Sequence, residues 1–185
     1  KNIDKLCIFT NKGDLHLVKV LDLPYGKFRD KGTPIDNVSN YDSSKEDIVF
    51  IAPLMDVEKH TLIFGTKSAM IKLVDGAEFV VTRKTSQATK LMDDDELLFV
   101  HMLSENATMV MRSKKEMFLR IDCATIPEKK KAAVGVRGMR LDREDELTDI
   151  YLLNDQEEKE VEVKGKQVAL NRLHIANRDT KGVKK

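Results

Sequence analysis

A short apolar stretch followed by a lysine-containing turn recurs about every fifty residues along this chain. The turn lysines are Lys12, Lys67, Lys114 and Lys164, which are 55, 47 and 50 residues apart. Short apolar stretches bounded by Asn-Lys-Gly or Lys-Gly are typical of a strand, a tight turn and a second strand, so each copy predicts a β-hairpin. A period of this length requires one supersecondary unit to be built several times, which restricts the fold to repeat architectures.

Two further landmarks follow each hairpin. A basic segment with a small residue comes first, at residues 29–33, 83–86, 135–138 and 178–182. An acidic turn that leads into apolar residues comes next, at residues 46–49, 93–98 and 142–147. The fourth copy stops before its acidic turn, so the chain holds three full units and most of a fourth. We place these blade-like units at approximately 4–53, 54–104, 105–153 and 154–185.

Units of forty to fifty residues with several short strands are typical of propeller blades. Helical repeats would show apolar residues with a period of 3.6, and only residues 154–159 and 169–176 tolerate a helix. We therefore predict a single all-β domain over residues 1–185, with about four blades of four short strands. Corresponding turns of a propeller lie on the same rim, so we expect the hairpin lysines and basic segments on one girdle and the acidic turns on another.

The charge of the chain is balanced in total and uneven in distribution. Lysine and arginine number 32 against 31 acidic residues, which argues against a uniformly basic nucleic-acid protein and against an acidic tail. Residues 129–140 nevertheless carry +5, residues 141–162 carry −8 and residues 163–185 carry +6. A nearly neutral protein can thus have strongly polarised surfaces if the fold brings like segments together.

Length and composition exclude several other classes. A chain of 185 residues with 41% hydrophobic residues can bury a core, so it is not disordered as a whole. Cys7 and Cys123 lack CxxC spacing, which excludes a disulfide scaffold and indicates small core residues of a reduced, cytosolic protein. The sequence has no apolar run of membrane-spanning length and no signal segment. The chain opens at Lys1 without methionine, so we expect a fragment of a longer protein.

The sequence predicts no metal or catalytic site. Residues 93–95 are three aspartates, but they occupy the repeated acidic turn, which favours a solvated connector over a metal site. The histidines at 16, 60, 101 and 174 lie in different units and lack metal-ligand spacing. Glycines 32, 138 and 182 are interpreted as turn residues.

The chain resembles the C-terminal domain of the A subunit of bacterial type IIA topoisomerases, which are DNA gyrase and topoisomerase IV. The most specific stretches are residues 6–13, residues 31–35, and residues 135–141 leading into 145–147. The resemblance implies a β-pinwheel, a propeller-like disc whose blades exchange strands. It also implies that a basic outer rim binds duplex DNA without sequence preference and bends or wraps it, in support of ATP-dependent control of supercoiling or decatenation.

The same resemblance assigns the chemistry to other parts of the parent enzyme. The family's catalytic tyrosine follows an arginine, whereas Tyr25, Tyr41 and Tyr151 follow proline, asparagine and isoleucine. We therefore expect no catalytic residue or cofactor in this chain, and ATP and magnesium bound elsewhere in an ATP-hydrolysing type II topoisomerase. The implied partners are duplex DNA, the B subunit, and the catalytic core of the same A subunit, in the bacterial cytoplasm at the nucleoid and without a membrane.

The chain departs from the gyrase pattern in two ways. It lacks the glycine-rich heptapeptide with glutamine and arginine, the gyrase A box, since residues 129–131 before Gly135 have no Arg-Arg-Gly-Gly core. It also has material for about four blades, where gyrase pinwheels have six. Both departures favour a topoisomerase IV-like or degenerate subunit, although a box could lie outside this chain. The alternative from another class is a propeller that serves as a protein-interaction scaffold.

The candidate DNA contacts are the basic residues of the hairpin turns and of the segments that follow. A lysine or arginine that neutralises a phosphate releases counterions and positions the protein without reading bases. The candidates are Lys12, Arg29, Lys31, Lys67, Arg83, Lys84, Arg112, Lys114, Lys115, Lys129, Lys130, Lys131, Arg137, Arg140, Lys164, Lys166, Arg178 and Lys181.

Overall fold

The computed structural model describes residues 4–185 and contains an antiparallel hairpin at each of the four expected turns. The hairpins are β1 (Lys5–Thr10) with β2 (Asp14–Lys19), β4 (Thr61–Thr66) with β5 (Met70–Asp75), β8 (Thr108–Ser113) with β9 (Met117–Asp122), and β12 (Glu160–Val163) with β13 (Lys166–Ala169). The third residue of the first turn, Gly13, has a positive φ of 78°. Ala69 and Glu116 adopt the same left-handed conformation at the third position of the next two turns.

A third strand follows each acidic turn and returns to its own hairpin. These strands are β3 (Ile48–Pro53), β7 (Leu97–Met102) and β11 (Leu147–Leu153), and they pair antiparallel with β1, β4 and β8. The pairing register shifts near the acidic turn in all three cases, which marks a β-bulge at the same place in each unit. The sequence repeat is therefore also a structural repeat.

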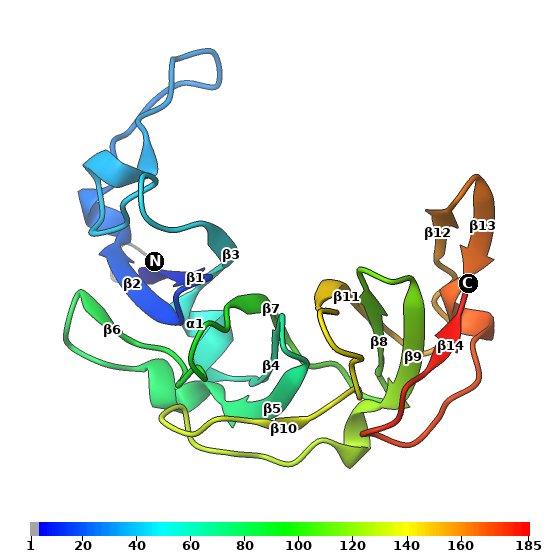
Figure 1. Cartoon of the computed structure of the whole chain (residues 1–185). Coiled ribbons are helices and arrows are strands. Elements are labelled where there is room, and N and C mark those ends of the chain that lie inside the picture. The colour runs from blue at the N-terminus through cyan, green and yellow to red at the C-terminus, as the bar shows by residue number, and fades with distance from the viewer. Residues whose placement is uncertain (1–3) are drawn as a thin grey trace.

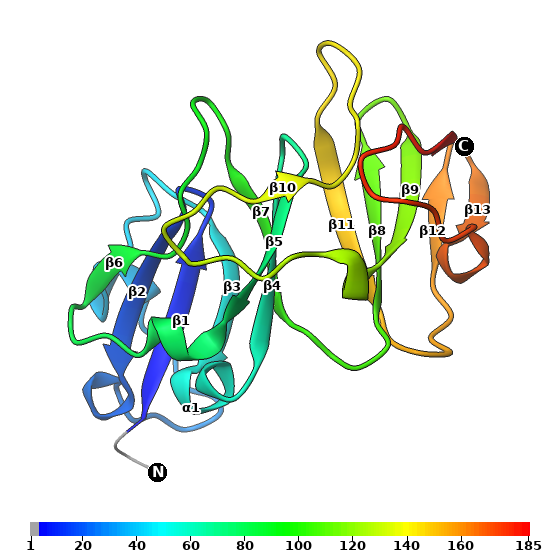
Figure 2. The same ribbon diagram turned by 90° about the horizontal axis from the view of Figure 1, so that it is seen from below.

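The fourth strand of each sheet comes from the next unit along the chain. β6 (Thr85–Gln87) pairs with β2, β10 (Val136–Arg137) pairs with β5, and β14 (Val183–Lys184) pairs with β9. Three four-stranded sheets result, with the orders β3-β1-β2-β6, β10-β5-β4-β7 and β11-β8-β9-β14. Figures 1 and 2 show them side by side along an arc. The predicted all-β pinwheel is confirmed, although within residues 4–185 the fourth sheet has only β12 and β13.

Two glycines allow the exchanged strands to approach their host hairpins closely. A Cβ at Gly135 would lie 2.3 Å from the carbonyl oxygen of Ile71, and a Cβ at Gly182 would lie 2.3 Å from that of Phe118. Gly182 also has a positive φ of 76°. Each glycine directly precedes an exchanged strand, so the absence of a side chain there permits the pairing.

Three hydrophobic cores lie between consecutive units, and a smaller cluster around Ile8 and Tyr41 lies within the first unit. The first joins the first and second hairpins, where the ring of Phe9 lies 5.2 Å from that of Phe79 and 6.0 Å from that of Phe64. The second joins the second and third hairpins through residues such as Ile63 and Met109, and the third joins the third and fourth. Each unit therefore buries its apolar face against a neighbour, as in other repeat proteins.

The helical segments are single turns that connect strands. They are η1 (Val20–Asp22), η2 (Ile35–Asn37), α1 (Leu54–Glu58), η3 (Gly76–Phe79), η4 (Cys123–Thr125) and η5 (Leu170–Arg172). Of the two stretches that tolerate a helix, residues 154–159 form none and residues 169–176 contain only η5, whereas α1 was not expected. Within the described part of the chain, no helix has the length and apolar character that a membrane span needs.

The basic segment of the first unit differs from the other three. Residues 24–33 form the blue loop that projects from the arc in Figure 1, and within residues 4–185 this loop pairs with no hairpin. The side chains of Tyr25 and Phe28 are fully exposed on it. We call this loop the free arm.

Candidate nucleic-acid interface

The exchanged strands lie on the outer edge of the arc. The inner strands contact one another in turn, β3 with β7 and β7 with β11, and the exchanged strands lie at the opposite edge of each sheet. Basic side chains lie on or beside these outer strands. They are Arg83, Lys84, Arg137, Arg140, Arg178 and Lys181, of which all but the half-buried Arg178 are exposed. We call these six residues the outer bases.

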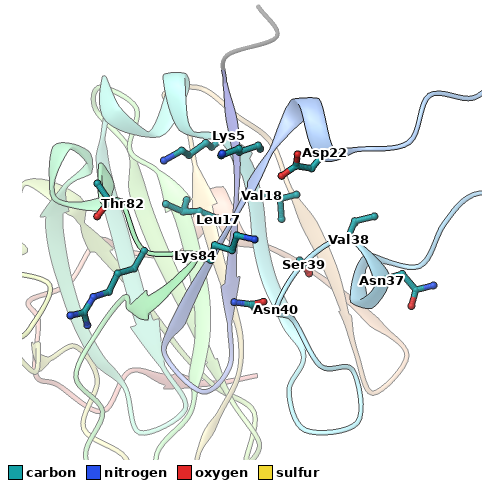
Figure 3. A pocket seen from close by; sticks show the side chains of 12 residues that line it. Lys5, Leu17, Val18, Asp22, Asn37, Val38, Ser39, Asn40, Thr82 and Lys84 are labelled. Carbon is teal, nitrogen blue, oxygen red and sulfur yellow. The ribbon is translucent and has the colours of Figure 1, made fainter.

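A hollow opens where the first unit meets the segment that leads to β6. It has a volume of about 360 Å³ and is lined by Lys5, Lys19, Arg83 and Lys84, with Asp22 as its acidic member. Figure 3 shows that side chains from β1, β2, residues 37–40 and the segment that leads to β6 surround it. Four cationic side chains from three segments therefore line one concave surface, which suits an anionic ligand.

A second basic cluster lies where the segments that carry the exchanged strands β10 and β14 meet. Arg137 Nη1 is 3.5 Å and Arg140 Nε is 3.7 Å from Asp179 Oδ1. Arg178 donates a hydrogen bond to the carbonyl oxygen of Arg137 at 3.0 Å. One carboxylate thus faces two guanidinium groups and a third belongs to the same cluster, which leaves a net positive charge on this part of the outer edge. Beside it, Lys181 is 2.8 Å from Asp142.

The lysine run at residues 129–131 lies in the loop that joins η4 to β10. Lys129 and Lys130 are exposed, whereas Lys131 is half-buried. The backbone N–H of Lys129 donates to the carbonyl oxygen of Leu73 at 2.8 Å, which attaches the loop to β5 of the preceding unit. We call residues 129–133 the lysine loop.

The hairpin turns contact the acidic turns, so the expectation of two separate girdles is wrong. The backbone N–H groups of Asn11, Lys67 and Lys114 donate to the carbonyl oxygens of Asp47, Glu96 and Glu146 at 2.8 to 3.0 Å. The physical reason is the pairing of each third strand with the first strand of its hairpin, since this register brings the start of the third strand to the hairpin turn.

Two turn lysines share one carboxylate. Lys12 Nζ lies 3.5 Å and Lys67 Nζ lies 2.5 Å from the carboxylate oxygens of Glu96. The hydrogen bond from Lys67 lowers the pKa of Glu96, and the same bond raises the pKa of Lys67. Lys67 and Glu96 are therefore both charged at neutral pH, and the Glu96 carboxylate lies within ion-pair distance of both lysines. A partly exposed pair of this kind adds little to stability.

The remaining candidate residues are dispersed. Arg112 is half-buried and engaged by Glu116, to which it donates two hydrogen bonds of 3.0 Å. Lys115 donates to the carbonyl oxygen of Arg143 at 2.7 Å. The others are exposed in different places: Lys114 on the third hairpin turn, Lys164 and Lys166 on the fourth hairpin, and Arg29 and Lys31 on the free arm.

The cysteines and the acidic turn have structural roles. Burial raises the pKa of Cys7 and of Cys123 to about 12, so both are thiols at neutral pH and pack in the core. Asp95 Oδ1 accepts hydrogen bonds from the backbone N–H groups of Ser68 and Glu96, at 3.0 and 2.8 Å. Across residues 4–185, no three histidine, cysteine or acidic residues gather in an arrangement that could hold a metal ion.

Lys5 and Lys19, which line the hollow of Figure 3, are not among the DNA contacts predicted from the sequence. They are directly paired across the first hairpin, where the second hairpin pairs Thr61 with Asp75. A basic pair at a position where the next repeat has threonine and aspartate is a signal that alignment of the units would have provided.

Comparison with known proteins agrees with this geometry. A family described as "DNA gyrase C-terminal domain, beta-propeller" matches residues 60–104 and 110–154. The A subunit of DNA gyrase from Lawsonia intracellularis is 24% identical over 96% of this chain. A crystal structure of the C-terminal domain of DNA topoisomerase IV is 25% identical, covers 98% of this chain and superposes with a TM-score of 0.88.

The chain is thus similar to the C-terminal domains of gyrase A and topoisomerase IV over most of its length. A solved gyrase A C-terminal domain, 19% identical, shares the fold over 99% of this chain with a TM-score of 0.71. The chain spans 23% of the Lawsonia protein, 58% of the topoisomerase IV chain and 60% of the gyrase A chain. The resemblance inferred from residues 6–13, 31–35 and 135–147 is thereby confirmed.

Proposed function

We propose that this chain binds duplex DNA without sequence preference along its outer edge and bends it there, as part of the A protein of a type IIA topoisomerase. The observation that carries the proposal is the placement of the outer bases on successive exchanged segments. Phosphates recur along duplex DNA, so a row of cations on one convex edge matches a bent duplex. Bending tens of base pairs of DNA costs on the order of several kcal/mol, and an extended row of contacts is needed to offset this cost.

The lysine loop and the hollow of Figure 3 extend this row. Lys12 and Lys67 share the Glu96 carboxylate, as Arg137 and Arg140 share that of Asp179, so ion pairing alone does not separate the two sets. The turn lysines are less suited to phosphates because each of the first three hairpin turns also contacts an acidic turn. Acidic side chains beside the hairpin turns would also repel DNA. We therefore propose that the DNA path follows the exchanged segments and avoids the hairpin turns.

The remaining parts of the proposal concern the parent enzyme. We infer that its partners are the B subunit, which is a separate chain, and the catalytic core that belongs to the same polypeptide. ATP and magnesium would bind elsewhere in the complex, and the enzyme would act in the bacterial cytoplasm at the nucleoid. These inferences rest on the kinship with gyrase A and on the absence of an arginine-tyrosine pair in this sequence.

Charge reversal on the outer edge tests the DNA path. The variant Arg137→Glu with Arg140→Glu is expected to lower the affinity for a random duplex at least tenfold. The matched control, Lys12→Glu with Lys67→Glu, reverses the same number of charges on the hairpin turns and is expected to lower it much less. Fluorescence anisotropy at one salt concentration measures both. Equal effects, or a larger effect of the turn variant, would contradict the proposed path.

Two observations favour a topoisomerase IV-like role over gyrase-like wrapping. The gyrase A box heptapeptide is absent from this sequence, and the superposition is better on the topoisomerase IV domain than on the gyrase domain. We therefore expect the chain to trap little negative writhe, or weakly positive writhe, when plasmid DNA is relaxed in its presence. A strong shift of the topoisomers toward negative writhe would refute this part of the proposal.

A further inference from the structure

A buried lysine holds the lysine loop from inside the molecule. Lys72 is the third residue of β5, and its side chain is only 1% exposed. Its ammonium group donates to three backbone carbonyl oxygens of the next unit, those of Lys130 at 3.2 Å, Lys131 at 3.0 Å and Ala133 at 2.6 Å. An ammonium has three N–H donors, so the loop satisfies all of them.

The surroundings of Lys72 suit a cation that is held by carbonyl groups. The ammonium lies 5.5 Å from the ring centroid of Phe64, and Glu78 is the acidic group that acts on its charge. The carboxylate of Glu78 accepts a hydrogen bond from the backbone N–H of Lys131 at 3.3 Å. Lys72 and Glu78 therefore both hydrogen-bond to the lysine loop, Lys72 to its carbonyl groups and Glu78 to a backbone N–H.

Basic side chains also contact the next unit at the other two junctions, from the third residue of β2 and from the fourth residue of β9. His16 is the third residue of β2, as Lys72 is of β5, and its Nδ1 lies 2.9 Å from the hydroxyl oxygen of Thr85 on the exchanged strand β6. Arg120, on β9, donates to the carbonyl oxygens of Asn171 and Leu173 at 2.6 and 3.2 Å. At each junction, a basic side chain on the second hairpin strand thus contacts the part of the next unit that lies on or before its exchanged strand.

We propose that Lys72 is a positioning residue for DNA binding, which draws the carbonyl groups of the lysine loop inward and so presents Lys129 and Lys130 on the outer edge. An ordinary core residue at this place would leave three carbonyl groups to find water, and the loop would have to open to reach it. This inference deepens the proposed function and rests on it. The hydrogen bonding of Lys72 to the lysine loop, which we call the clamp, is measurable without DNA.

The test compares Lys72→Met and Lys72→Arg with the parent chain by two measurements. The first is hydrogen exchange of the lysine loop amides in the absence of DNA. The methionine variant is expected to lose at least tenfold in the protection of these amides, and the arginine variant to retain most of it, because guanidinium donors can still reach the carbonyl groups.

The second measurement is the salt dependence of DNA affinity. The slope of log K against log salt should be shallower in Lys72→Met by roughly 0.9 for each loop lysine that leaves a phosphate. In a background with Lys129, Lys130 and Lys131 changed to glutamine, the same substitution should change nothing further. The control Val74→Ala removes core volume from the same strand, so it should lower stability and leave the slope unchanged.

Three results would overturn the inference. One is unchanged protection of the loop amides in Lys72→Met, which would show that no clamp exists. Another is equal loss of protection in Lys72→Arg, which would show that the shape of the lysine matters and its donors do not. The third is an undiminished effect on affinity in the glutamine background, which would place the effect outside the loop. If the parent chain itself fails to bind DNA, the proposed function fails while hydrogen exchange still decides the clamp.

Discussion

Lys72 carries its charge in the interior between the second and third units, and its burial has a consequence for stability. Burial lowers the pKa of Lys72 from 10.5 to about 8. Between these two pH values the unfolded chain binds more protons at this site than the folded chain does, so the contribution of Lys72 to stability rises with pH.

The free energy of unfolding of the parent chain, relative to Lys72→Met, should therefore increase between pH 7 and pH 10. The gain should approach roughly 3 kcal/mol, at about 1.4 kcal/mol for each pH step across the interval. Urea denaturation of both proteins at the two pH values measures it. A difference that stays constant or falls as the pH rises would contradict the burial of a charged lysine.

Gly135 and Gly32 give a second prediction at the residue scale, because they precede equivalent segments with different surroundings. A methyl group at Gly135 would lie 2.3 Å from the carbonyl oxygen of Ile71, whereas one at Gly32 would meet nothing within 4 Å. Gly135→Ala should destabilise the chain by about 1 to 3 kcal/mol, since β10 must move away from β5. Gly32→Ala should change stability by less than about 0.5 kcal/mol. Thermal unfolding of both variants tests this, and similar losses would mean that the free arm is packed in solution.

The hairpin turn is the element at which charge and fold interact most closely. Glu96 lies beside Lys12 and Lys67 on two neighbouring turns. Glu96→Gln removes this carboxylate, and the proposed DNA path predicts less than a twofold change in affinity and no change in the salt slope. Arg137→Gln with Arg140→Gln should instead make the slope shallower by nearly 2, at about 0.9 per phosphate. A steeper slope in Glu96→Gln would show that the freed lysines reach DNA.

The hairpins and third strands could be predicted from the sequence, whereas most contacts between these elements could not. The hairpins follow from turns such as residues 11–13, where glycine supplies the positive φ, and the third strands follow from apolar runs after acidic turns. Strand exchange entered only through the family resemblance, because β6, β10 and β14 are two or three residues long and carry no strand pattern. The contact between the turn at Lys67 and Glu96 depends on the register of strand pairing, so charge counting could not find it.

The residues of the candidate site also differ in whether they could be predicted from the sequence. The outer bases could be identified from sequence because they recur with the period of the repeat. Lys5 and Lys19 could be found only by aligning the units with one another, and Lys72 could not be found at all, since its role depends on the place where one unit meets the next. The apolar neighbours of Lys72 in β5 predict a strand, and they do not distinguish a buried lysine from an exposed one.

The whole molecule is an arc of units that each depend on their neighbours. The three cores that join hairpins lie between consecutive units, and every exchanged strand crosses the same junction. The outer bases are therefore positioned by the junctions, and the shape of the basic edge follows from the angle between successive sheets (Figure 1). Loosening one junction should disturb the DNA path on both sides of it.

The central claim is that this edge binds the phosphate backbone of duplex DNA. The most direct measurement is the affinity of the parent chain for a random duplex of about 40 base pairs, determined by anisotropy across a series of salt concentrations. Neutralisation of five or more phosphates predicts a slope of log K against log salt of roughly −4 or steeper, with equal affinity for duplexes of unrelated sequence. Weak binding that does not respond to salt would contradict the claim and favour a protein-docking role for this surface.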